Sequence, residues 1–243
     1  VAGIAVSTYY PSVAVIISHS SRVTMIVDAI RDSTVRAQNT YGAVACGGIA
    51  AYASIATLVG SASASVIIRN ESTISLMGRA QHNSTITAFS QANTGKCTVS
   101  LGICAHSPTS ASVRIGDTSA CSASGVASDN SRIFATSQLS NAAAGIAIEG
   151  KGATLSISRH SHLHLEALAT EDAAIISNRS AAAVHIQGDD GLTGLTVEDH
   201  SSVVINTNAT NASVIKATAS FPSALHPCAA GGIAIRTAYA QVP

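Results

Sequence analysis

Three alternating histidines are the densest group of possible metal ligands in the sequence: His160, His162 and His164. In a β-strand, residues i and i+2 point to the same face, so a His-x-His pair could bind one metal ion with a third ligand from a neighbouring strand. The same alternation also places them on a polar surface opposite Leu163 and Leu165, which is the commoner arrangement. We therefore predict that the chain binds no metal and no other cofactor, and these histidines are the candidates that could contradict that prediction.

A short acidic stretch is the second place where side chains could do chemistry. It contains Asp189, Asp190, Glu198 and Asp199. Enzymes that cleave polysaccharides need carboxyl groups that converge on the substrate. Asp is also common at turns, because its side chain bonds to its own backbone, and no Arg or Lys suited to catalysis stands nearby. We predict that the protein is not an enzyme; the alternative is a carbohydrate-active enzyme (polysaccharide lyase or hydrolase type) that uses these four residues.

The elements that must position these residues are short β-strands. In residues 153–169, apolar and polar residues alternate on both sides of a polar corner at Arg159 and His160, and a period of two indicates β-strand. The same frame returns along the chain, and superposing the copies aligns one serine after each corner. We predict that these serines form an inward ladder of hydroxyl groups beside a bend. The column consists of Ser21, Ser72, Ser119, Ser161 and Ser201.

A second strand phrase falls between the copies of the first, for example in residues 42–52 (GAVACGGIAAY) and 143–150 (AAGIAIEG). Two phrases per repeat predict roughly 20–25 residues for each coil, within the range of stacked-repeat proteins. Because hairpin signals are nearly absent and equivalent residues recur in register, a parallel stack is favoured. The predicted fold is all-β, a single right-handed parallel β-helix (β-solenoid). It runs continuously over residues 1–243, which we expect to be a segment of a longer chain.

Composition argues against several classes of protein. Charged residues make up only 11% of the chain, with 13 basic and 13 acidic residues, so the net charge gives no reason to expect nucleic acid or an anionic membrane as partner. Aromatic residues make up only 3%, so small and β-branched side chains must fill the interior, as suits narrow stacked coils. Residues 42–60 are uncharged but poor in large apolar residues, so we predict a coil there rather than a membrane span.

Cysteine spacing excludes one disulfide within the chain and favours another. Cys46 and Cys97 each follow a column serine by the same distance, so with the predicted coil length they stack two coils apart, about 10 Å, which is beyond disulfide reach. Cys97 and Cys104 are close in sequence and are the predicted pair if any forms. The number of cysteines, 5, is odd, so at least one is free or pairs outside this sequence.

Five tripeptides match the acceptor pattern for N-glycosylation, Asn-x-Ser/Thr without Pro. A chain rich in Ser and Thr produces such matches by chance, but we expect at least one to carry a glycan, at a corner or loop from which it could project. Glycosylation would place the protein outside the cell or on its surface. The candidate asparagines are Asn70, Asn83, Asn178, Asn208 and Asn211.

The Ala/Ser/Thr/Val-rich phrases and the glycosylation patterns, as in SVVINTNATNASVIKA (residues 202–217), resemble the dispersed-gene-family surface proteins of kinetoplastids. More loosely, they are similar to the pectin-lyase-like β-helices of bacterial adhesins. The resemblance implies a long, glycosylated, cell-surface β-helix with an adhesive role and no catalytic residues. We predict an extracellular structural or adhesive β-helix, a stalk, filament or adhesin. Its predicted partners are other protein chains of a surface assembly or host and matrix glycans.

Overall fold

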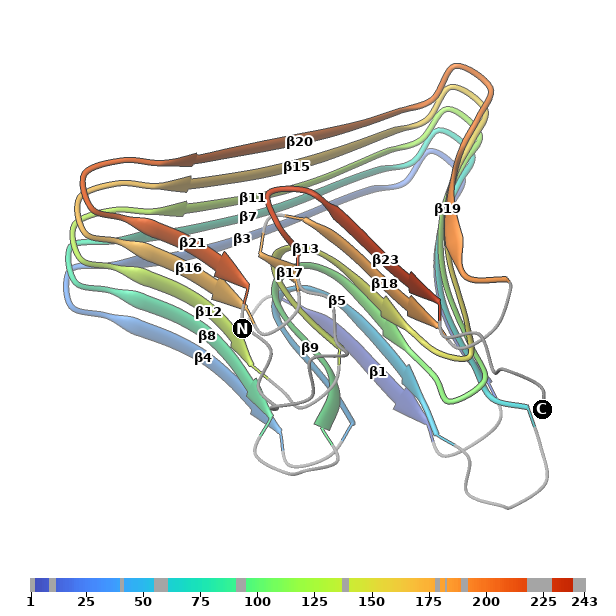
Figure 1. The fold of residues 1–243 in the computed structure, drawn as a ribbon, viewed down its shortest axis with the longest axis horizontal. Coiled ribbons are helices and arrows are strands. Elements are labelled where there is room, and N and C mark those ends of the chain that lie inside the picture. Colours follow the sequence, from blue (N-terminus) through green and yellow to red (C-terminus); the bar gives the residue numbers. More distant parts are fainter. Residues whose placement is uncertain are drawn as a thin grey trace.

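The computed structural model describes residues 3–8, 12–39, 42–54, 61–90, 95–136, 140–177, 180–181, 183–188, 192–217 and 229–237. The regular elements of these segments are all β-strands. Neighbouring strands run parallel, and equivalent strands of successive coils stack in register (Figure 1). The chain is therefore all-β, a right-handed parallel β-helix, as predicted.

Each full coil contributes strands to four sheets, A to D. Sheet A is made of β1 (Ile4–Thr8), β5 (Gly42–Ala53), β9 (Gly95–His106), β13 (Ser140–Glu149), β17 (Ser180–Ala181), β18 (Val184–Gly188), β22 (Ala229–Ala230) and β23 (Ile233–Thr237). Sheet B is made of β2 (Ser12–Ile17), β6 (Ser63–Ile68), β10 (Ser110–Ile115), β14 (Gly152–Ile157) and β19 (Gly194–Val197). Sheet C is made of β3 (Arg22–Ile30), β7 (Thr73–Gln81), β11 (Ala120–Ala127), β15 (His162–Ala169) and β20 (Ser202–Ala209). Sheet D is made of β4 (Thr34–Asn39), β8 (Thr85–Ser90), β12 (Arg132–Thr136), β16 (Ala174–Ser177) and β21 (Val214–Ala217).

One coil is longer than the predicted 20–25 residues. Each of the first four column serines donates its backbone N–H to the serine hydroxyl of the next coil, over sequence separations of 51, 47, 42 and 40 residues. These separations are the coil lengths, so the predicted length was wrong. The reason is that both strand phrases belong to the same coil: the serine phrase forms sheets B and C, and the phrase between its copies forms sheet A.

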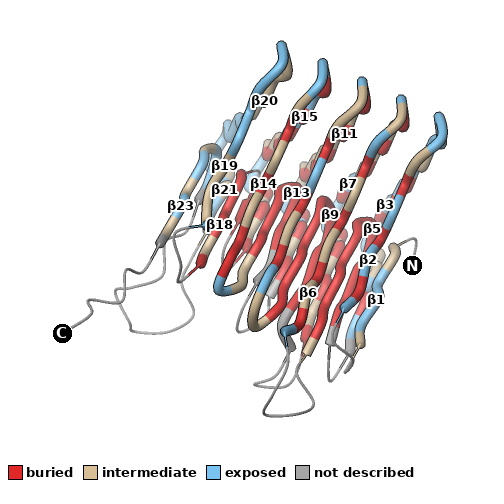
Figure 2. The backbone as a smooth tube through the Cα atoms, turned by 90° about the vertical axis from the view of Figure 1, so that its right-hand side faces the viewer, coloured by how far each residue is buried: buried red, intermediate tan, exposed pale blue. Residues whose placement is uncertain are grey.

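The apolar interior is divided into two lobes by a bend in sheet A. One lobe lies between sheet B, the first half of sheet C and the second half of sheet A, with Ile68 and Leu76 among its buried residues. The other lies between the second half of sheet C, sheet D and the first half of sheet A, and includes Ile86 and Ile133. Figure 2 shows that the middle coils are the most deeply buried, whereas β1–β3 and β19–β23 lie at opposite ends of the stack.

The lobes meet at a waist where sheets A and C approach each other closely. Leu101 of β9 is fully buried there. A Cβ atom added to Gly78 of sheet C would lie 2.5 Å from Leu101 Cδ1, and one added to Gly125 would lie 3.4 Å from that atom. In the first coil the glycine belongs to sheet A and the large residue to sheet C: a Cβ on Gly47 would lie 2.6 Å from Val27 Cγ2. Large residues of one sheet therefore face glycines of the other.

The bend in sheet A is formed by a stack of glycines. Gly48, Gly102 and Gly145 pair in register on successive coils, and Gly102 has a φ of +110°, a backbone conformation that side chains with Cβ rarely adopt. A Cβ on Gly102 would lie 2.0 Å from the carbonyl oxygen of Gly145. The bend therefore requires glycine at this position for two reasons, the backbone angle and the closeness of the next coil.

Both corners of sheet C are two-residue turns in the left-handed region, with φ between 52° and 62° in every coil. Asn and Asp tolerate this region well, but Arg159, His160 and Glu171 adopt it as well. The backbone explains why. The N–H of Glu71 donates to the carbonyl of Asp117 at 2.8 Å, and equivalent bonds join the other coils, so hydrogen bonding between coils continues through the corners.

The predicted ladder of serine hydroxyls is confirmed at the corner between sheets B and C. The hydroxyls of Ser72, Ser119, Ser161 and Ser201 each accept the N–H of the column serine one coil earlier, at 3.0–3.3 Å. Sequence reasoning missed a second ladder at the corner between sheets C and D, although its residues recur with the same spacings. It consists of Ser33, Ser84, Ser131 and Ser213, with Ala173 in the remaining coil.

Replacing Ser119 with alanine should destabilise the fold by about 1 kcal/mol, because the buried Ser72 N–H loses its acceptor at 3.1 Å. The cost is at the low end of the usual range, since the second ladder shows how such an N–H is rescued. Where Ala173 offers no hydroxyl, the Ser131 N–H turns to the carbonyl of Ser128 at 3.2 Å. Urea unfolding measures the effect, with Ser112→Ala on the outer face of sheet B as the control. Equal stability losses in the two variants would contradict the ladder's role.

The cysteines follow the predicted pairing, on different geometry. Cys97 and Cys104 form a disulfide, with Cα atoms 5.8 Å apart, across the bend of the single strand β9 rather than across a loop. Cys46 is free and buried. It lies one coil from Cys97, not two, but the two residues belong to different apolar clusters of sheet A. Cys121 is also free and buried, and burial raises the pKa of its thiol to about 12. Cys228 lies outside the described residues.

Candidate binding groove on the outer face of sheet B

A groove of about 620 Å³ lies on the outside of sheet B, next to its corner with sheet C. Alternation along the strands creates its floor: Val66, Ile68 and their equivalents point inward, so the residues between them face solvent. Several of these outward residues are small and carry hydroxyls, which leaves the floor shallow. The floor includes Thr154, Ser156, Ser158 and Thr196.

Acidic and basic side chains are distributed unevenly along the groove. An ion pair joins Arg159 and Asp117 on adjacent coils, with Nη1 and Oδ1 2.5 Å apart. This hydrogen bond, then the negative charges of Asp117, Asp199 and Glu198, raise the pKa of the Arg159 guanidinium. Arg159 is thus surrounded by acidic side chains at the end of the groove near the last coil.

Two arginines at the other end differ from Arg159. Arg69 follows β6 and Arg114 lies in β10, and both line the groove. Arg114 pairs in register with Ile67, so Arg69 stands one coil away and two residues further along, on the same outer face. Within the described part of the chain neither guanidinium has an ion-pair partner. This end of the groove therefore carries unneutralised positive charge.

The predicted carboxylate cluster is placed in part. Glu198 and Asp199 both line the groove, at the corner of the last coil, together with Asp117, which sequence reasoning did not select. Asp189 and Asp190 lie outside the described residues. Arginine is also present: Arg159 bonds to Asp117, although the sequence offered no basic residue close to this stretch. The stacking of coils, not sequence proximity, brings these charges together.

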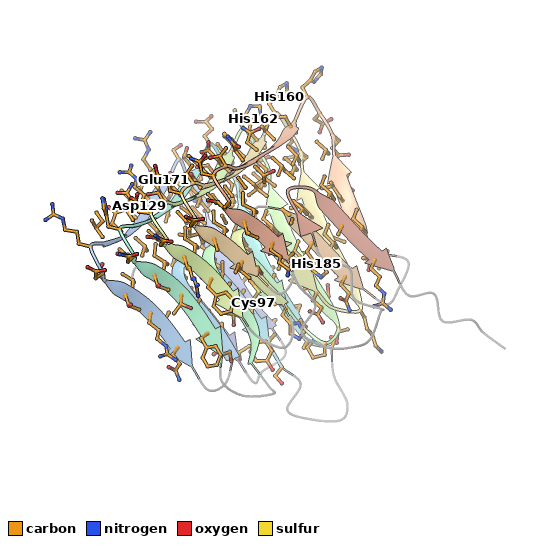
Figure 3. The ribbon with its side chains drawn as sticks, turned by 60° about the vertical axis from the view of Figure 1, so that its left-hand side comes forward. Cys97, Asp129, His160, His162, Glu171 and His185 are labelled. Carbon is orange, nitrogen blue, oxygen red and sulfur yellow. A yellow bond between two sulfur atoms is a disulfide. The ribbon has the colours of Figure 1, made fainter. Side chains whose placement is uncertain are left out.

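The three candidate histidines do not share one geometry. His162 and His164 lie on the outer face of β15, as predicted, where His162 Nδ1 is 2.9 Å from Ser202 Oγ and His164 Nε2 is 3.2 Å from Asn206 Nδ2. His160 belongs to the left-handed corner (Figure 3), and its ring stacks on His200 with centroids 5.3 Å apart. Among the described residues, no group of three or more His, Cys, Asp or Glu side chains has a geometry that could hold a metal ion.

Two glycosylation patterns have a structural explanation. At Asn70 and Asn211, the asparagine is the first left-handed corner residue, and the Ser two positions later is a ladder serine. An Asn-x-Ser pattern therefore arises wherever Asn occupies the first corner position and the ladder position holds Ser. Asn83 is also in a left-handed corner, whereas Asn208 lies on the outer face of β20. Both are exposed. Asn178 lies outside the described residues.

A polar column on sheet A, buried at Tyr52 and His106 and partly buried at Glu149 and Gln187, was also missed. Tyr52, His106, Glu149 and Gln187 pair in register on successive coils. The Tyr52 and His106 rings stack at 5.7 Å, and His106 Nδ1 lies 4.0 Å from Glu149 Oε2. His106, Glu149 and Gln187 also line a pocket of about 130 Å³. The only sequence signal was a polar residue at the same place in successive copies of the second phrase.

His185 lies on the same face of sheet A. Its alternation with the apolar residues Val184 and Ile186 indicates an outward side chain, yet it is fully buried. It lies on the folded outer face of sheet A (Figure 3), where it pairs with Ala147 in the same column as Cys104. Because the two halves of this sheet fold towards each other, a side chain that points away from the main core is still enclosed.

Two carboxyl groups share a hydrogen bond at the corner between sheets C and D. The bond to Asp129 raises the pKa of Glu171, and the negative charge of Asp129 adds to the effect. The same bond lowers the pKa of Asp129, which also accepts from Ser128 and lies near His82, with Nε2 and Oδ2 3.7 Å apart. As pH falls, Glu171 is therefore protonated before Asp129.

The Glu171 shift predicts a pH dependence of stability. A raised pKa in the folded state stabilises the protein while the carboxyl is protonated, and this contribution is lost as pH rises through the folded pKa, above the ordinary value of about 4.3. The lowered pKa of Asp129 acts in the opposite sense, because its contribution is lost as pH falls. Glu171→Gln should remove the decline with rising pH. Unfolding free energies measured from about pH 4 to pH 7 test this, and parallel curves for the two proteins would contradict it.

The residues that the structure describes include no helix long and apolar enough to cross a membrane. In the uncharged stretch 42–60, β5 occupies residues 42–53, and residues 55–60 lie outside the described part of the chain. Comparisons with protein-family models, with curated proteins and with solved structures found no match for this chain. The geometry of the fold and of the groove is therefore the basis of the functional argument.

Proposed function

We propose that this chain is a stiff structural or adhesive part of an extracellular, cell-surface protein. The observation that carries the proposal is the continuity of hydrogen bonding between coils. Strands pair in register in all four sheets, and the corners of sheet C add both backbone bonds and serine bonds. A stack bonded around so much of each coil resists bending, as a stalk or a filament must.

Two features support an extracellular location. The Cys97–Cys104 disulfide is of a kind that persists in oxidising compartments and is rare in the cytosol. Asn83 and Asn208 are exposed acceptor asparagines, one at a corner and one on a flat strand face, from which a glycan could project into solvent. On this proposal the partners are other chains of a surface assembly or the glycans of a host or matrix.

Stretching single molecules between their two ends tests the mechanical part of the proposal. Coils should detach one at a time, and a coil of 40–51 residues should release about 13–18 nm of chain. A reductant should lengthen one step by about 2 nm, because the disulfide hides a separation of 7 residues. One step for the whole chain, or extension without measurable resistance, would contradict a stiff stack of coils.

The alternative is a carbohydrate-active enzyme, and one observation favours it: Asp117, Glu198 and Asp199 line a single groove. Incubation with acidic and neutral polysaccharides, followed by assay of new reducing and unsaturated ends, tests this alternative. Product formed by the natural chain and abolished by Glu198→Gln would support the enzyme. No product from any polysaccharide, with the fold intact by circular dichroism, would leave the structural proposal in place.

A further inference from the structure

The uneven charge of the sheet B groove suggests which ligand an adhesive β-helix of this kind would hold. Arg69 and Arg114 present two guanidinium groups from adjacent coils on one outer face, and both line the groove. A guanidinium binds carboxylate and sulfate groups through two parallel hydrogen bonds, which a more compact cation does not match. The arginine end of the groove is therefore suited to a ligand that carries more than one anionic group.

The floor beside the arginines favours a sugar chain over other polyanions. Ser156, Ser158 and Thr196 offer hydroxyls that can exchange hydrogen bonds with the hydroxyls of a saccharide. Successive coils are separated by about 4.8 Å, a distance comparable with the length of one sugar residue. A linear glycan lying along the stack would thus meet an equivalent position of the floor on each coil.

The acidic end of the groove determines where along it the anionic groups of a ligand can lie. Asp117 is neutralised by Arg159, but Glu198 and Asp199 lie beyond that pair at the last coil. An anionic group placed there would be repelled, whereas neutral hydroxyls would not. A uniform polyanion such as nucleic acid would place a charge against this end as well, so a chain with anionic groups interspersed among neutral sugars fits better.

We propose that the groove over sheet B binds an acidic glycan, with its carboxylate or sulfate groups on Arg69 and Arg114 and its neutral hydroxyls over Ser156 and Ser158. This inference rests on the proposed adhesive function and names the class of its ligand. The chemistry shared by carboxylated and sulfated glycans is an anion on a hydroxyl-rich chain, and binding measurements can separate the two sources.

The test uses the full chain and three immobilised probes: polygalacturonate for carboxylates, heparan sulfate for sulfates and dextran as the neutral chain. We expect binding to one or both acidic glycans, none to dextran, and weakening with added salt. The double variant Arg69→Gln/Arg114→Gln should bind at least about tenfold more weakly, because it loses charged hydrogen bonds. Its matched control is Arg22→Gln/Arg132→Gln, which removes two exposed arginines of sheets C and D and should bind as the natural chain does.

A second variant guards against loss of binding through misfolding. Glu198→Gln/Asp199→Asn removes the repulsive end of the groove and should strengthen binding to the same acidic probe. Equal binding by the arginine variant and its control, equal binding to dextran, or tighter binding of a poly-glutamate peptide than of either acidic glycan would each overturn the proposal. So would the absence of all binding. Stepwise unfolding under force would then still support the stiff coil stack, so the two failures can be told apart.

Discussion

Replacing Gly102 with alanine should destabilise the protein by roughly 4 kcal/mol or more, and the variant should be largely unfolded under native conditions if total stability is ordinary. Its φ of +110° is strained for any residue with a Cβ atom. The added carbon would also lie 2.0 Å from the Gly145 oxygen and 2.8 Å from its nitrogen, and these are backbone atoms that cannot rotate away. Circular dichroism and urea unfolding measure the outcome.

The matched control for Gly102 is Gly116→Ala. Gly116 follows β10 at the corner of sheet B, and a Cβ there would meet only Ser158 Oγ, at 3.5 Å, an ordinary contact. We expect a change within about 1 kcal/mol. Similar losses at the two glycines would show that the bend of sheet A does not depend on Gly102, and the division of the interior into two lobes would need another explanation.

Leu101→Ala should cost about 2–5 kcal/mol, the usual range for a leucine removed from a closed core. Leu101 is fully buried at the waist, where Gly78 and Gly125 of sheet C make room for it. Leu168→Ala, on the outer face of β15, is the control and should cost much less. Unfolding free energies for both variants come from urea titrations.

A double variant makes the Leu101 prediction sharper. Gly78→Ala alone should destabilise the fold, because its Cβ would lie 2.5 Å from Leu101 Cδ1. Combined with Leu101→Ala, the same methyl group enters the space that the leucine leaves, so the combined cost should be smaller than the sum of the two single costs. Strict additivity would mean that the two residues are not in contact at the waist.

The local features of the fold could be predicted from the sequence because they are set by short patterns. Alternation in residues 153–169 indicated strands, and the alignment of Ser119 with Ser161 indicated the ladder that the structure contains. The coil length could not be read from strand phrases alone, since two phrases of similar composition fit either two short coils or one long one. The serine spacings of 40–51 residues equal the coil lengths and therefore distinguish one long coil from two short ones.

The groove was harder to predict because its residues are far apart in sequence. Arg69 and Arg114 become neighbours only when β6 and β10 pair, and Asp117 meets Arg159 only through the corner of the next coil. The three histidines were candidate metal ligands because they are close in sequence, yet His160 lies in a corner and His162 on a strand. The burial of His185 depends on the bend of sheet A, and no local sequence pattern predicted that bend.

Electron cryo-microscopy of the protein in its native surroundings tests the central claim most directly. The account predicts rods of coils stacked about 4.8 Å apart on the outside of a cell, with glycan density on Asn83 or Asn208 and an acidic glycan or a neighbouring chain against sheet B. Rods inside the cell, with bare asparagines and a cleaved sugar in the groove beside Glu198, would contradict it and favour the enzyme.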